Sequence, residues 1–113
     1  MRVGIRVNES TLRANIMGIA EELGHQSAEV PMIYDFCPSH LDVLITQASA
    51  ESLVKHARKQ LGKYFVLVSP TGSGLEMVGN IPSNVYEIDT AYRGWQRRLT
   101  TILKKIKQAK QGG

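Results

Sequence analysis

The sequence predicts an α/β domain in which helices cover both faces of a parallel β-sheet. Three observations support this prediction. Strand-like and helix-like segments alternate five times within 113 residues. Residues 41–46 are apolar along their middle, as in a strand that is covered on both faces. The spacing between strands fits right-handed crossover connections. We expect one domain over residues 1–110 and a disordered tail over 111–113.

The first third of the chain predicts a strand, a helix and a second strand. Residues 2–7 alternate between polar and apolar side chains, which is typical of a short strand. Asn8-Glu9-Ser10 offers an N-cap, and a helical repeat of apolar residues then runs to Gly24. Residues 26–30 form a weaker second strand that Pro31 ends. Segment 31–40 leaves room for one irregular helical turn at most, because prolines bracket it.

The middle of the chain predicts the third and fourth strands with a helix between them. Residues 41–46 are the third strand, and Ser49 caps the helix that follows. Residues 64–69 are the fourth strand and the most strongly β-forming run of the chain. The inner face of the helix between them is predicted to consist of Ala50, Leu53, Val54, Ala57 and Leu61.

The last third predicts one more strand and a long helix. Segment 70–84 contains three glycines and two prolines and is too broken for a regular helix. Residues 85–88 are a short fifth strand, and an amphipathic helix begins at about Ala91. These elements predict a flavodoxin-like three-layer α/β/α sandwich with reduced second and fourth helices. Its five-stranded parallel sheet is expected to have the order 2-1-3-4-5.

Composition limits the environment of the chain. Hydrophobic residues make up 42% and charged residues 21%, and no run approaches the ~18 apolar residues of a transmembrane span. The N-terminus MRVGIRV has the pattern of a strand rather than of a signal peptide. The single Cys37 excludes an internal disulfide and fits a reducing compartment. We expect a cytoplasmic location, and a membrane anchor in a longer parent protein stays open.

Positive charge is concentrated at the C-terminal end. Residues 1–92 carry seven Lys and Arg against ten acids, whereas residues 93–113 carry seven Lys and Arg and no acid. The high pI therefore describes the last helix rather than the whole domain. Its candidate partner contacts are Arg97, Arg98, Lys104 and Lys105. We expect a protein partner rather than nucleic acid, since few aromatic residues accompany these cations and the apolar stripe is needed for packing. A membrane-proximal partner and a solvated face without a partner stay open.

Polar residues follow the first, third and fourth predicted strands. Because the carboxyl ends of these strands surround one crevice in such a sheet, we expect these residues to gather there. They are Asn8, Glu9, Thr46, Gln47 and Ser69.

At these strand ends the sequence resembles the receiver domain of response regulators. The segment RVGIRVNESTLRANIMGIAEELGHQSAEV is similar to the first strand, acidic loop, first helix and second strand of a receiver. LDVLITQ is similar to the strand that carries the phosphoacceptor, and YFVLVS to the fourth strand with its terminal hydroxyl residue. The resemblance implies a role in two-component signalling, within a hybrid sensor histidine kinase or a response regulator.

The receiver reaction needs two acids for Mg²⁺, an acceptor aspartate, a hydroxyl residue and a lysine. In this chain those positions correspond to Asn8 and Glu9, to Gln47 (Thr46 if the register slips by one), to Ser69, and to Ile88-Asp89. An amide cannot form an acyl phosphate, and one acid holds Mg²⁺ poorly. The resemblance therefore implies a pseudo-receiver, a non-catalytic interaction domain that needs no cofactor.

Two further segments suggest sites of other classes. SPTGSG contains a candidate anion loop, Thr71, Gly72, Ser73 and Gly74, which would make the chain a small stand-alone binder of a phosphorylated, nucleotide or flavin ligand. Cys37, His40 and Asp42, with Asp35 nearby, could form a nucleophilic or metal site. We expect no metal, because one Cys and one His fall short of the usual four ligands.

Overall fold

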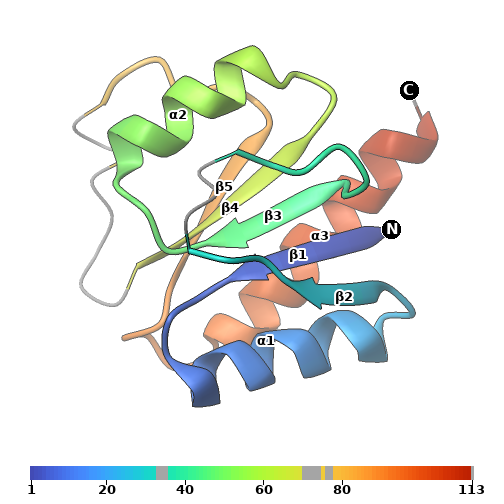
Figure 1. Cartoon of the computed structure of the whole chain (residues 1–113). Coiled ribbons are helices and arrows are strands. Elements are labelled where there is room, and N and C mark those ends of the chain that lie inside the picture. The colour runs from blue at the N-terminus through green and yellow to red at the C-terminus, as the bar shows by residue number, and fades with distance from the viewer. Residues whose placement is uncertain (33–35, 70–74, 76–77, 113) are drawn as a thin grey trace.

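The computed structural model describes residues 1–32, 36–69, 75 and 78–112. It contains the predicted five-stranded parallel sheet in the order β2-β1-β3-β4-β5 (Figure 1). The strands are β1 (Arg2–Arg6), β2 (Gln26–Glu29), β3 (Val43–Thr46), β4 (Tyr64–Ser69) and β5 (Val85–Asp89). The helices are α1 (Ser10–Glu22), α2 (Ala50–Lys59) and α3 (Trp95–Gly112). The flavodoxin-like arrangement expected from the sequence is therefore confirmed.

Helices α1 and α3 cover one face of the sheet, and α2 covers the other (Figure 1). The alternation of side chains along each strand divides the core between the two faces. Val3 and Ile5 of β1 pack with Ile16 of α1 and with Leu99 of α3. On the opposite face, Leu44, Phe65 and Leu67 pack with Leu53, Val54 and Ala57 of α2. Strands β3, β4 and β5 thus contribute apolar residues to both layers. Strand β1 contributes to the layer under α1 and α3 only, and no residue of β2 belongs to either buried cluster.

The N-caps of α1 and α2 lie where the sequence predicts them, but α2 ends earlier than its apolar repeat suggests. The N-cap of α1 is Glu9, whose carboxylate accepts hydrogen bonds from the backbone N–H groups of Thr11 and Leu12. The N-cap of α2 is Ser49, as predicted. The prediction that Leu61 lies on the inner face of this helix is wrong. The helix ends at Lys59, and Leu61 lies in the turn beyond it with 75% of its surface exposed.

No α-helix joins β2 to β3 or β4 to β5 among the residues that the structure describes, which agrees with the reduced helices expected there. Between β2 and β3, side chains from the connection pack directly on the sheet. Gly4 of β1 makes this approach possible, since a Cβ atom there would lie 2.4 Å from Leu41 Cδ1 and 2.8 Å from Val30 Cγ2.

Helix α3 begins at Trp95, four residues later than the expected start near Ala91. It extends to Gly112, so residues 111 and 112, placed in the expected tail, are helical and exposed. Its apolar stripe, which includes Leu99, Ile102 and Ile106, is buried against the sheet and α1. No helix in the described part of the chain is long and apolar enough to cross a membrane.

Candidate functional site

A buried arginine lies at the carboxyl ends of β1 and β3. Arg6, the last residue of β1, is only 7% exposed and is the register partner of Thr46. Its Nη1 donates to the Thr46 hydroxyl at 3.1 Å and to the backbone oxygen of Gln47 at 2.8 Å. Its Nη2 donates to the backbone oxygen of Met32. The guanidinium therefore joins two strand ends to the segment that follows β2.

Gln47 is held at both its backbone and its side chain. Its backbone N–H donates to the oxygen of Arg6 at 3.1 Å, which extends the ladder between β1 and β3. Its Oε1 accepts from the backbone N–H of Asn8 at 2.8 Å. The structure thus brings Asn8, Thr46 and Gln47 together, as predicted. Each of them is engaged in joining the ends of β1 and β3.

Glu9 has a different role from the one that its sequence position suggests. Both of its carboxylate oxygens accept hydrogen bonds from the first turn of α1, at 3.0 Å and 3.2 Å. The positive end of the helix dipole stabilises a carboxylate in this position. Glu9 is therefore directed at its own helix as a cap and not at Thr46 or Gln47.

Ser69 lies farther along the same edge of the sheet. It is buried at the end of β4, two residues beyond the Leu67 that pairs with Thr46, and its register partner is Asp89. The carboxylate of Asp89, where the resemblance requires a lysine, accepts from the backbone N–H of Ala91 at 2.9 Å. Among the residues described at the carboxyl ends of the strands, the structure does not bring together the acids, the acceptor aspartate and the lysine that a receiver requires.

A hollow of about 320 Å³ opens beside the ends of β1 and β2. Asn8 is the one predicted residue that lines it, together with Val7, Val30 and Met32. Arg13 and Glu29 form an ion pair at its wall, with 3.0 Å between Nε and Oε1. The hollow is thus bounded mainly by backbone, by apolar side chains and by one ion pair.

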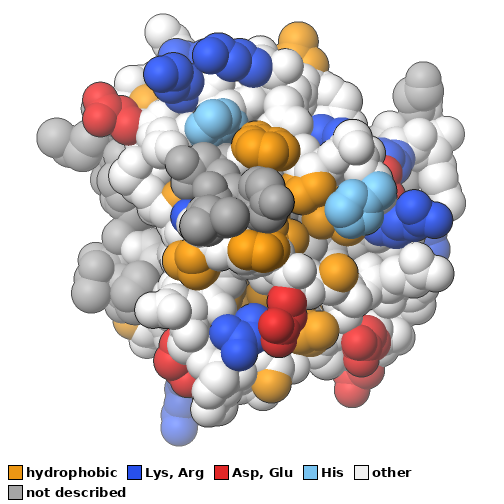
Figure 2. All heavy atoms as spheres, in the orientation of Figure 1, with side chains coloured by type: hydrophobic (Ala, Val, Ile, Leu, Met, Phe, Trp, Pro, Cys, Tyr) orange, Lys and Arg blue, Asp and Glu red, His pale blue; other side chains and the backbone are white. Residues whose placement is uncertain are grey.

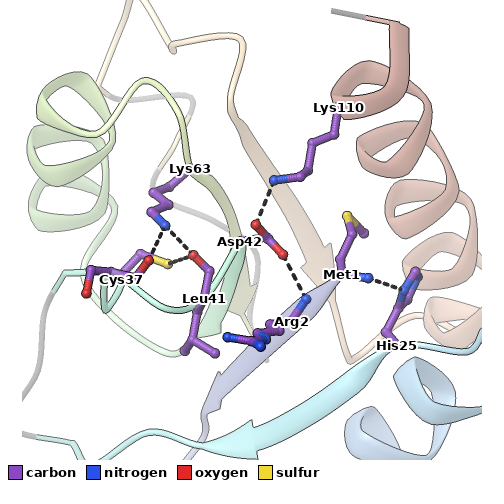
Figure 3. A network of polar contacts seen from close by, with 9 residues as sticks. Met1, Arg2, His25, Cys37, Leu41, Asp42, Lys63 and Lys110 are labelled. Carbon is purple, nitrogen blue, oxygen red and sulfur yellow. Dashed lines mark hydrogen bonds and ion pairs between the residues drawn. The ribbon is translucent and has the colours of Figure 1, made fainter.

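The cluster around Cys37 is not arranged for nucleophilic chemistry. Burial raises the pKa of Cys37 to about 11, and its thiol lies 3.7 Å from the backbone oxygen of Leu41. Asp42 accepts instead from the backbone N–H of Arg2 and from Lys110 (Figure 3). No group of three or more His, Cys, Asp or Glu residues suited to a metal occurs in the described part of the chain. Asp35 lies outside the described residues.

The predicted anion loop, Thr71, Gly72, Ser73 and Gly74, also lies outside the described residues.

The four cations predicted as partner contacts are exposed on α3. Nε of Arg98 donates to the backbone oxygen of Glu87 on β5 at 3.1 Å. The side chains of Arg97, Lys104 and Lys105 make no hydrogen bond or ion pair within the part of the chain described. Arg97 and Lys104 are seven residues apart and therefore lie above one another on the helix.

Arg6 is a site residue that the sequence did not predict. The segment RVGIRV does contain an indication of this role. Arg6 follows Gly4 on the face of the strand opposite Val3 and Ile5, and it places a charge there. That face was expected to be covered, so a cation at its end needed a polar partner. The partners are a side chain of β3 and two backbone oxygens, which the sequence alone does not identify.

No protein-family model matches this chain, and a comparison with curated proteins finds no significant relative. The interpretation of the site therefore depends on the geometry of its own residues.

Proposed function

We propose that this chain is a pseudo-receiver, a non-catalytic interaction domain of a two-component signalling protein that does not accept phosphate. The observation that carries the proposal is the position of Arg6. Its guanidinium is bonded to Thr46 and Gln47 at the strand end where the resemblance places the phosphoacceptor. The parent would be a hybrid sensor histidine kinase or a response regulator, with this domain in the cytoplasm.

The chemistry at this edge opposes the receiver reaction at three points. A guanidinium bonded at the acceptor position repels the divalent cation that the reaction requires. Gln47 offers an amide, which cannot be converted to an acyl phosphate. Glu9, the one acid in the loop after β1, already accepts two hydrogen bonds from α1. These three features support a loss of phosphotransfer with retention of the fold.

The exposed cations of α3 support the interaction role. Arg97, Lys104 and Lys105 remain available on one helix, and residues 93–113 contain no acid that could neutralise them. Complementary charge raises the rate and the specificity of association with an acidic protein surface. We therefore propose α3 as the surface that contacts a kinase or regulator domain.

The first experiment tests phosphotransfer. The chain is incubated with acetyl phosphate and Mg²⁺, and its intact mass is measured beside a receiver domain that is phosphorylated under the same conditions. We expect the mass of the chain to remain unchanged. A gain of one phosphoryl group would overturn the proposal.

The second experiment tests the partner. A photoreactive amino acid replaces Lys104 on α3 in living cells, and Lys55, an exposed residue of α2, serves as the matched control. We expect Lys104 but not Lys55 to crosslink to a histidine kinase or response regulator. Crosslinks to no signalling protein, or the same crosslinks from both positions, would contradict the assignment of α3.

A further inference from the structure

Strand β2 forms one edge of the sheet and presents an open backbone. The N–H of Gln26 donates to the oxygen of Met1 at 3.0 Å, and that of Val30 to the oxygen of Ile5 at 2.9 Å. Backbone groups alternate in direction along a strand, so those of Ser27 and Glu29 point away from β1. The outer edge of β2 therefore offers two N–H groups and two carbonyls at the spacing of a further strand.

The opposite edge of the sheet is protected in a way that β2 is not. In β5, the backbone groups of Val85, Glu87 and Asp89 point outward, because Asn84 and Thr90 bond to β4. The guanidinium of Arg98 donates to the Glu87 carbonyl and so occupies the middle of that edge. The side chains of Ser27 and Glu29 instead bond to Glu21 and Arg13 of α1. Among the residues that the structure describes, none forms a hydrogen bond with the outward backbone groups of Ser27 and Glu29.

An apolar hollow lies beside this edge on the face that α2 covers elsewhere. It has a volume of about 310 Å³, and its lining is mostly apolar, with Ala28, Val30 and Leu41 among its residues and His40 as a polar one. Ala28 is the register partner of Gly4, so its side chain projects on that same face. Figure 2 shows hydrophobic side chains gathered on the side that faces the viewer, in the region of β2 and β3. The hollow can receive the apolar side chain of a strand that pairs with β2.

The other face of the same edge carries acidic side chains. The carboxylate of Glu21 accepts from the Ser27 hydroxyl at 2.8 Å, and Glu29 is 63% exposed beside its partner Arg13. A strand added at β2 would place alternate side chains over the hollow and over these carboxylates. Charge complementarity therefore favours basic residues at those positions of the added strand that lie over the carboxylates.

From these observations we infer that β2 is a docking edge for an extended peptide segment of a partner protein, with apolar and basic residues in alternation. The segment pairs with Ser27 and Glu29 as a sixth strand. Its apolar residue enters the hollow beside Ala28, and its basic residues face Glu21 and Glu29. This site lies on β2 and does not depend on the receiver-like assignment of the strand ends or on α3.

The test selects random linear peptides displayed on phage against the full chain. The affinity of each enriched peptide is then measured for wild type, for Ser27→Pro and for Ser27→Ala. Ser27→Pro removes an outward N–H without removing a bond to β1, because proline is tolerated at edge positions whose N–H faces solvent. Ser27→Ala is the matched control, since it loses the same hydroxyl but keeps the N–H. We expect affinity to fall about tenfold for Ser27→Pro and to stay within about twofold for Ser27→Ala.

A second variant and a second measurement guard against a folding defect in Ser27→Pro. Ala28→Arg places a bulky cation at the exposed edge of the hollow and should weaken the peptide by a similar factor. Hydrogen exchange of the Ser27 and Glu29 amides should slow when the peptide binds wild type. The inference would be overturned if no peptide were enriched. It would also be overturned if the peptides bound Ser27→Pro and Ala28→Arg as tightly as they bind wild type. A wild-type dimer that Ser27→Pro converts to monomer would assign the edge to a second copy instead.

Discussion

Nζ of Lys110, near the end of α3, lies 2.6 Å from Oδ1 of Asp42, which precedes β3 (Figure 3). The other carboxylate oxygen of Asp42 accepts from the backbone N–H of Arg2 at 2.8 Å. One carboxylate therefore fastens the last turns of α3 to the amino-terminal edge of the sheet. Its two partners are separated from it by 40 and 68 positions in sequence.

Lys110→Met should destabilise the domain by about 1 kcal/mol. The pair is partly buried, with 32% and 28% of the two side chains exposed, so solvent screens part of its energy. Lys105→Met is the control, because Lys105 lies on the same helix without a partner in the described structure. Urea unfolding of the variants measures the difference. Equal midpoints for the two variants would mean that the ion pair does not stabilise the fold.

The same carboxylate should make stability depend on pH in the acid range. Partial burial raises the pKa of Asp42, but the hydrogen bonds from Arg2 and Lys110 outweigh burial and hold this pKa below its usual value of 3.8. The stabilisation is therefore present above pH 3.8 and is lost as the pH falls through the lower folded-state pKa. We expect Asp42→Asn to be less stable than wild type near neutral pH, and this difference to shrink below pH 3.8. Thermal unfolding across this range would contradict the assignment if the difference stayed constant.

Gly4→Ala should destabilise the domain by about 1 to 3 kcal/mol, because the added methyl group would overlap Leu41 and Val30. Gly18→Ala is the matched control in α1, where a Cβ atom meets nothing within 4 Å. It should stabilise by about 0.5 to 1 kcal/mol, since alanine is the better helix former. Chemical unfolding of both variants measures the change in the free energy of unfolding, which should fall for Gly4→Ala and rise for Gly18→Ala. A neutral Gly4→Ala would show that the segment after β2 can move off the sheet.

The sequence predicts the strands and helices well because their signals are local. Val3, Ile5 and the alternating residues around them identify a strand, and Ser49 identifies the start of a helix. Alternation of the two element types then restricts the topology to a few arrangements. Strand order could therefore be predicted without knowledge of any single contact.

The roles of the polar residues could not be predicted in the same way, because they depend on contacts between distant segments. Arg6 is bonded across to Thr46 and Gln47, about 40 residues away in sequence. Glu9 lies where the resemblance expects a metal ligand, but its carboxylate is directed at its own helix. Leu61 continues a helical repeat after the helix has ended, so its periodicity was misleading. A pattern shows the face on which a residue lies but not the partner it meets.

Asn84 is another polar residue whose role only the structure reveals, and Asn84→Asp should cost about 3 kcal/mol or more. Its buried Nδ2 donates to the backbone oxygens of Ala57, Gln60 and Lys63 at 3.0 to 3.2 Å. Aspartate would place a buried negative charge against three carbonyl oxygens. The oxygens of Ala57 and Gln60 would keep their backbone donors, but the new carboxylate oxygen would have none at this position.

The same chemical change at Asn80, an exposed residue with φ of 48°, serves as the control for Asn84. Asn80→Asp should alter stability by less than about 0.5 kcal/mol, because aspartate tolerates this backbone conformation and no buried group is affected. Thermal unfolding of both variants at neutral pH makes the comparison. Similar losses at the two positions would remove the role assigned to the Asn84 amide.

Gln60→Ala should release the segment that holds Cys37 and accelerate its alkylation. The Gln60 side chain makes a reciprocal pair with the Cys37 backbone, accepting from its N–H at 3.0 Å and donating to its oxygen at 2.9 Å. In wild type Cys37 is 1% exposed and burial raises the pKa of its thiol to about 11, so reaction with iodoacetamide near neutral pH should be slow. Loss of two hydrogen bonds should cost about 1 to 2 kcal/mol. If reaction proceeds through local opening, this corresponds to alkylation about 5 to 30 times faster. Gln108→Ala, an exposed change on α3, should leave the rate unchanged, and equal rates for the two variants would show that Gln60 does not control access to Cys37.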